Sequence, residues 1–227
     1  MQVKLQWATP DIDKQIMFMA RVSNPANQNS ENSRLLRYCM EHGHVSPFEM
    51  ASVCMEIDTT RDIARQILRH RSFSFQEFSQ RYADVGQLPG WELRECRLQD
   101  TANRQNSLEA DDPYVIGLWY EMQCEVAELA IARYKTALKE GIAKEQARAL
   151  LPEGLTPSRV YMAGTVRSWI FYLHQRLDAS TQKEHRMIAD HVLAVLRTVA
   201  PITMDAFLRG HKHPSCFILK RHPIFNG

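Results

Sequence analysis

The sequence lacks the features that would place a protein in a membrane, in an oxidising compartment or on nucleic acid. No apolar run approaches the about 20 residues of a membrane-spanning helix, and residues 1–5 contain no apolar signal-peptide core. The five cysteines are scattered and form no CxxC pair, which is typical of reduced, buried thiols. The formal net charge is only +2 over 227 residues, so bulk charge does not indicate a nucleic-acid binder. We therefore expect a cytoplasmic protein that binds neither a membrane nor nucleic acid.

The chain also lacks internal repeats, linkers and a regular βαβ alternation. Its 227 residues suffice for one good core but not comfortably for two domains, so we expect a single domain over residues 1–227. Period-2 alternation predicts strands at residues 3–8, 51–57, 91–98 and 159–163. Helical periodicity predicts helices at residues 9–22, 30–41, 60–70, 113–139, 144–151, 166–177 and 182–199, with a last turn at 205–208. This mixture predicts an α+β fold, with a mainly antiparallel sheet packed with helices, and argues against a Rossmann sheet.

The longest predicted helix, residues 113–139, carries apolar residues at helical spacing, which predicts a buried stripe. The stripe consists of Val115, Leu118, Trp119, Met122, Val126 and Leu129. The polar segment 100–112 before it has no strong pattern and fits a mobile loop. The basic tail, which includes His211, Lys212, His213 and His222, fits a solvated surface.

Residues 69–82 form the most unusual stretch of the chain, with three arginines, a histidine and three serines in fourteen residues. The preceding helix delivers Gln66, Arg69 and His70 near its last turn. Guanidinium groups beside hydroxyl and backbone N–H donors suit phosphate oxygens. A solvated helix end followed by a polar loop explains the same composition equally well. A third hypothesis is a nucleic-acid-binding module, in which aromatic residues of this stretch stack on bases. These residues are Phe73, Phe75 and Phe78.

The order of residues in this stretch favours the first hypothesis. The stretch resembles the signature of the flavin-dependent thymidylate synthases. It has Arg-His-Arg at 69–71, then seven residues, then Ser79, followed closely by Arg81-Tyr82. The resemblance extends from about His42 to His185. It includes the segments 42–49, 145–152, 163–169, 173–176 and 182–185.

The resemblance implies that the chain makes dTMP from dUMP. Methylenetetrahydrofolate would supply the carbon, NADPH the reducing equivalents, and FAD would be the working cofactor; no metal is implied. The implied FAD-binding residues are Ser46, Arg69, His70, Arg71, Glu77, Thr165, Val166, Arg167 and Phe171. The implied dUMP-binding residues are Gln66, Ile67, Leu68, Arg69, Glu77, Phe78, Ser79, Gln80, Arg81, Arg148 and Arg176. His44 and Glu49 would line the site.

Arg176 is the candidate catalytic residue. Uracil C5 becomes a better nucleophile when negative charge on N3 and O4 is stabilised, and a positioned guanidinium does this. Ser79 has no obvious base beside it in the sequence, and no cysteine falls in a matched motif, so covalent catalysis by either is not expected. The pair His42 and His44 is weak ligand spacing for zinc. A nucleotide enzyme without flavin stays open as an alternative.

Four positions depart from the usual pattern of the family. Thr165 stands where Asn is common and Phe171 where Asn or His is common, so details of flavin contact are open. Met50 and Gln76 are the other two departures.

The resemblance also implies a homotetramer that shares its active sites between chains. Gln66, Arg69 and Arg176 would lie on one side of the nucleotide, and the partner would supply the other side. The partner's set would be Glu77, Ser79, Arg81 and Arg148. Ten extended residues can span ~33 Å, so the two halves of the motif need not meet in one site.

Overall fold

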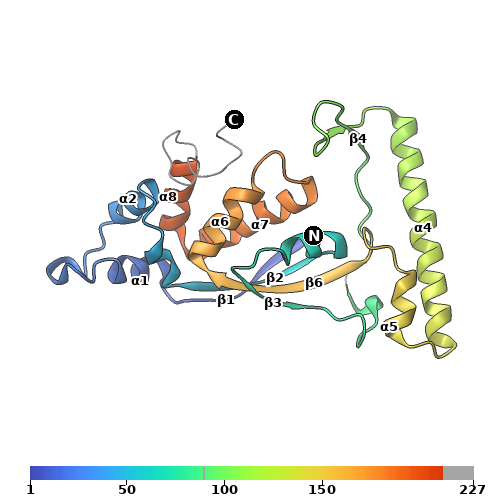
Figure 1. The fold of residues 1–227 in the computed structure, drawn as a ribbon, viewed down its shortest axis with the longest axis horizontal. Helices are drawn as coiled ribbons and strands as arrows, with labels where there is room; N and C mark the ends of the chain where they lie inside the picture. Colours follow the sequence, from blue (N-terminus) through green and yellow to red (C-terminus); the bar gives the residue numbers. More distant parts are fainter. Residues whose placement is uncertain (89, 212–227) are drawn as a thin grey trace.

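The structure is a computed structural model and describes residues 1–88 and 90–211 (Figure 1). Lys212, His213 and His222 of the predicted basic tail lie outside the described residues. Within them, a four-stranded sheet has the order β1-β2-β6-β3, and all neighbouring strands run antiparallel. Its strands are β1 (Gln2–Ala8), β2 (Ser52–Thr60), β6 (Pro157–Thr165) and β3 (Ser74–Glu77). The α+β fold with an antiparallel sheet is therefore confirmed.

The centre of the sheet is the β2–β6 pair, which stays in register from Ser52 opposite Thr165 to Thr60 opposite Pro157. Val53, Met55 and Ile57 of β2 are fully buried in one continuous core that includes residues of six α-helices. Those helices are α1 (Ile12–Met19), α2 (Arg34–Glu41), α3 (Arg61–Ile67), α6 (Val166–Arg176), α7 (Lys183–Val199) and α8 (Pro201–His211). In Figure 1, α6 and α7 lie over the sheet, and α2 and α8 lie together at one end.

The opposite face of the same two strands is polar. Glu56 and Asp58 of β2 stand directly across from Tyr161 and Arg159 of β6. Arg159 forms two hydrogen bonds with Asp58, at 2.7 and 2.9 Å, and the Tyr161 hydroxyl donates to Glu56 at 2.8 Å. Because these carboxylates are almost buried, each needs such a partner.

The longest helix, α4 (Pro113–Lys139), stands at the far end of the molecule from α1 and α2 (Figure 1). Its bounds match the prediction, and Asp112 caps it by accepting from the Tyr114 N–H. The predicted burial of its apolar stripe is wrong. Trp119 and Val115 are half-buried, but Leu118, Met122, Val126 and Leu129 are exposed. Periodicity identifies an apolar face but not what covers it, and within one described chain little covers this face.

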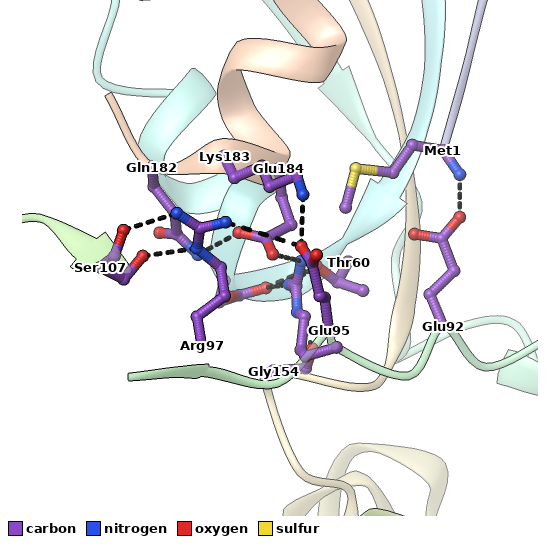
Figure 2. Close-up of polar contacts among 12 residues, drawn as sticks. Met1, Thr60, Glu92, Glu95, Arg97, Ser107, Gly154, Gln182, Lys183 and Glu184 are labelled. Carbon is purple, nitrogen blue, oxygen red and sulfur yellow. Dashed lines mark hydrogen bonds and ion pairs between the residues drawn. The ribbon is translucent and has the colours of Figure 1, made fainter. Parts of the chain in front are cut away.

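A groove of about 850 Å³ runs beside that face. Apolar side chains of α4 form one wall, and the segment that contains Arg94, Glu95 and Arg97 forms the other. Figure 2 shows the ties across this segment: Lys183 contacts Glu95, and Arg97 contacts Ser107. The groove thus combines a largely apolar lining with several charged and polar side chains.

Several predicted elements differ from the structure. The stretch after Arg-His-Arg, expected to be an open loop, forms β3, because its residues pair with β6 from Ser74 opposite Ala163 to Glu77 opposite Val160. The strand expected at 91–98 is only β4 (Arg97–Gln99). It pairs with β5 (Ser107–Glu109) inside the segment expected to be a mobile loop. The last turn is the longer helix α8, which begins at Pro201.

In the described part of the chain, no helix combines the length and the apolar character needed to cross a membrane.

Candidate active site

The candidate site is organised by α3 (Arg61–Ile67), which begins where β2 ends. Ile63 and Ile67 are fully buried and fix this helix against the core. Gln66 and His70 are four residues apart, so they project toward the same side at the end of the helix. The backbone of Arg69 and His70 continues the last turn, with N–H bonds back to Gln66 and Ile67. The core contacts of α3 therefore bring Gln66, Arg69 and His70 to one place.

Arg176, the candidate catalytic residue, contacts this helix end directly. Its Nε donates a hydrogen bond of 2.9 Å to Nε2 of His70, although the two residues are 106 positions apart. An arginine cannot accept, so His70 Nε2 carries no proton here. Burial, followed by the charge of Arg176, lowers the pKa of His70 to about 4. A neutral imidazole thus holds the guanidinium in place.

The surroundings of Arg176 are electropositive. Burial lowers the pKa of its guanidinium, the nearby Tyr172 opposes this, and the neighbouring charge of Arg69 lowers it further. A guanidinium stays protonated despite such shifts. Two cations held close together, one of them partly desolvated, form a site for an anionic ligand.

Apart from Glu77, which pairs with Ser158, the residues assigned to FAD gather around the start of α6. Thr165 caps this helix, and its side chain accepts from the Ser168 N–H. Arg167 pairs with Glu49 at 2.5 Å, which ties α6 to the 3₁₀ helix η2 (Ser46–Glu49). The Arg167 guanidinium also lies over the Phe171 ring, 5.4 Å from its centroid.

These features fit a flavin dinucleotide. Phe171 and Arg167 are both partly exposed on one side of α6, which offers a flat aromatic and cationic surface. The Ser168 hydroxyl donates to the Ser72 carbonyl at 3.1 Å, so the Arg69–Arg71 turn lies close to α6. Arginines there suit the phosphates of a dinucleotide. Val166 is different, because its side chain is in the core and its N–H bonds the Ala51 carbonyl.

Two of the three phenylalanines of the stretch, Phe73 and Phe75, pack against the core. Phe73 packs edge-on against Trp169, with ring centroids 4.7 Å apart, and Phe75 also contacts the core. The Phe73 ring lies so close to Gly164 that a Cβ there would come within 2.4 Å of it. These two rings are not available to stack on bases, so the nucleic-acid hypothesis loses two of its three phenylalanines.

The other predicted nucleotide-binding residues lie near the opposite end of α3. Arg81 approaches Glu145 at 3.5 Å, and Arg148 donates to the Glu145 carbonyl. Glu77 accepts from the Ser158 hydroxyl at 2.9 Å. Arg61, the first residue of α3, feels the charges of both Glu77 and Arg148. At 1.5 Å per residue, the seven residues of α3 separate this group from the Gln66 end by ~10 Å or more.

Three predicted residues are enclosed by the protein. Ile67 has no exposed surface, Gln80 is only 3% exposed, and Val166 is in the core, so their side chains do not reach a ligand from the surface. By contrast, Leu68, Phe78 and Ser79 are half-buried.

Sequence reasoning did not assign a role to two residues at the site, His185 and Gln182. Gln66 forms hydrogen bonds with both of them. The segment 182–185 resembled the family, but no residue within it stood out, because contacts across about 116 positions leave no local pattern.

The comparisons with known proteins identify the family. The sequence model of the family described as thymidylate synthase complementing protein matches residues 4–202. A flavin-dependent thymidylate synthase from Synechocystis is 50% identical over 77% of this chain and 79% of its own length. The chain belongs to the flavin-dependent thymidylate synthase family. The resemblance noted in residues 69–82 is thereby confirmed.

Two further relatives support the assignment to the flavin-dependent thymidylate synthases. A probable flavin-dependent thymidylate synthase from Paramecium bursaria Chlorella virus 1 is 47% identical over 77% of this chain and 81% of its own length. A solved structure of a UMP/dUMP methylase from Streptomyces cacaoi, bound with 5-Br dUMP, superimposes with a TM-score of 0.78. The two sequences are 27% identical, and the match covers 92% of this chain and 94% of the methylase chain.

Proposed function

We propose that the end of α3 together with Arg176 binds dUMP, that the start of α6 binds FAD, and that these sites perform the reaction of the family. As a flavin-dependent thymidylate synthase, the chain is an enzyme that methylates dUMP to dTMP and uses FAD. Methylenetetrahydrofolate and NADPH are its co-substrates. The observation that carries the residue assignment is the hydrogen bond from Arg176 to a neutral His70.

Arg176 would act on the uracil ring. Held by His70, its guanidinium is oriented before substrate arrives, and preorganised donors stabilise developing negative charge most effectively. This guanidinium would stabilise the negative charge that develops on N3 and O4 of the uracil. FAD, when bound, supplies the redox chemistry of the reaction, and the protein contributes position and charge.

FAD would be held by Ser46, by the 69–71 turn and by the first turns of α6. Thr165, Arg167 and Phe171 are the α6 residues with accessible side chains. Glu77 would act as an acceptor toward a sugar hydroxyl, since it accepts from Ser158 in the structure.

The dUMP phosphate would be bound by donors from both ends of α3: Gln66, Ser79, Arg81 and Arg148. We propose that the two ends come from different chains of a homotetramer. Leu118, Met122 and Val126 of α4 are exposed along the large groove, and Leu129 is exposed further along the same helix. Such an apolar surface is typical of a subunit interface. Two-fold symmetry would then let each half complete the site of the partner.

We further propose that residues 1–227 form one domain, since a single core includes residues from Ile12 to Phe207. A cytoplasmic location is consistent with the four free cysteines among the described residues. The protein would bind small molecules and neither nucleic acid nor membranes.

Titration with FAD is the first test. Bound FAD should colour the protein yellow, NADPH should bleach it and air should restore the colour. The same preparation should form dTMP from dUMP and methylenetetrahydrofolate. Saturating FAD that shows no binding would contradict the proposed flavin site. FAD binding without dTMP formation would contradict the proposed activity.

A further inference from the structure

A chain of side-chain hydrogen bonds runs from Glu184 at the start of α7 to His185, through Gln182 and Gln66. Gln182 Nε2 donates to Glu184 at 2.9 Å, and the two residues lie side by side in Figure 2. Gln66 Nε2 donates to Gln182 Oε1 at 2.7 Å, and Gln66 Oε1 is 3.2 Å from His185 Nδ1. Four residues from two helices are thus connected in series.

In this series of hydrogen bonds, the carboxylate of Glu184 fixes which group donates and which accepts at every step. Glu184, 3.8 Å from the Arg94 guanidinium, has only acceptor atoms to offer. Gln182 must therefore turn its NH₂ toward Glu184 and its oxygen toward Gln66. Gln66 must then turn its NH₂ toward Gln182 and its oxygen toward His185. The positions of the oxygen and the nitrogen in each amide therefore follow from the hydrogen bonds alone.

At the other end, His185 must donate from Nδ1, because the Gln66 oxygen can only accept. The ring has no exposed surface, and among the described residues its Nε2 has no hydrogen-bond partner. Among the described residues, the bond to Gln66 is thus the one hydrogen bond that the ring forms. Burial, followed by the charges of Arg176 and His70, lowers the pKa of His185 to about 3, so the neutral form persists.

The consequence concerns the amide nitrogen of Gln66. One of its two hydrogens bonds Gln182, and in the described part of the chain the second has no further acceptor. With the oxygen held by His185, the amide is kept from turning over. It therefore keeps a free donor close to the charges of Arg176, which acts on His185, and of Arg69, which acts on Arg176. A phosphate has oxygens that accept, so it matches a donor and would be repelled by the amide oxygen.

We propose that His185 is a positioning residue that locks the Gln66 amide with its N–H toward the dUMP phosphate. This rests on the proposed function, in which Gln66 contacts dUMP. His185 itself touches no ligand. Its effect passes through one hydrogen bond, which makes the proposal separable from a general role in the core.

The test measures dissociation constants of dUMP and of deoxyuridine, which lacks the phosphate, for the FAD-bound protein. His185→Leu should weaken dUMP binding about tenfold or more, the size expected when one hydrogen bond to a charged group is lost. Deoxyuridine binding should stay unchanged. His185→Asn, which keeps an N–H close to the Nδ1 position, should recover part of the dUMP affinity.

A double-mutant cycle shows whether His185 acts through Gln66. In a Gln66→Leu background, His185→Leu should cause no further loss of dUMP affinity. If His185→Leu does not fold, His185→Phe, which keeps a ring in the core and removes the Nδ1 donor, should give the same selective loss. Equal weakening of dUMP and deoxyuridine, additive losses in the cycle, or unchanged dUMP affinity would each overturn the proposal. Wild-type protein that binds FAD but no dUMP would instead contradict the proposed function.

Discussion

The end of α3 and the segment after β3 supply the two halves of the proposed dUMP site, and they are built in different ways. At the end of α3, two key side chains are held by others: Arg176 bonds His70, and Gln66 bonds the fully buried His185. After β3, Arg81 is 55% exposed, and its partner Glu145 is 50% exposed. One half is rigid before any ligand arrives, whereas the other is held only by surface contacts.

This difference shows which contacts position the side chains of each half. An exposed ion pair contributes little and constrains a side chain weakly. The α3 end is therefore preorganised by its own chain, while Arg81 and Arg148 need a ligand or a neighbouring subunit to order them. Four predictions sharpen or break this comparison.

The largest effect is expected at the rigid half. Arg176→Ala should lower turnover by about a hundredfold or more, on the order of 3 kcal/mol, because a preorganised donor to the uracil is lost. FAD should remain bound. Arg176→Lys should recover little, since a point charge does not replace a planar fork. The measurement is dTMP formation with the flavin spectrum as control. Wild-type turnover in the Ala variant would remove Arg176 from the mechanism.

The second prediction asks whether the halves belong to different chains. Arg176→Ala and Arg81→Ala should each be inactive alone. After unfolding, mixing and reassembly, about a quarter of all sites would be intact with random pairing in an isologous dimer unit. Activity near that level is expected. Mixed oligomers that are demonstrated by mass but are no more active than their parents would contradict site sharing.

The third prediction concerns the exposed face of α4. Val126→Glu combined with Leu129→Glu should dissociate the oligomer, because charges would be buried at an apolar interface. The isolated chain should keep its helix content, since both side chains are exposed in it. Size-exclusion chromatography with light scattering and circular dichroism measure the two effects. Glu128→Gln, on the polar side of the same helix, is the matched control and should leave the oligomer intact.

The last effect is expected in acid. His70 and His185 have folded-state pKa values of about 4 and about 3, below the ordinary value of about 6.5 for a histidine. As the pH falls below about 6.5, the unfolded chain binds protons that the folded chain does not, so the free energy of unfolding should fall until about pH 3. The stability from these groups is present above pH 6.5.

Denaturant unfolding at several pH values measures this slope. His185→Leu should reduce the slope of the free energy of unfolding against pH by up to about 1.4 kcal/mol per pH unit, which corresponds to one proton. An unchanged slope would show that His185 does not stay neutral in the folded protein.

The sequence by itself determined the family and the local elements that have a strong pattern. The Arg-His-Arg signature identified the family, and period-3.6 spacing with Pro113 placed α4 correctly. Such features are carried by residues close in sequence, so local order is enough to detect them. The same applies to the strand at the centre of the sheet, β2, whose alternating residues were recognised.

Only the tertiary structure decided what covers each surface and which distant residues meet. The apolar stripe of α4 is exposed in the chain because its partner surface is not within the described residues of that chain. β3 exists because β6, about 85 residues later, offers an edge to pair with. The contact between Gln66 and His185 joins residues 119 positions apart. Burial and pairing are properties of folded neighbours, and no local pattern records them.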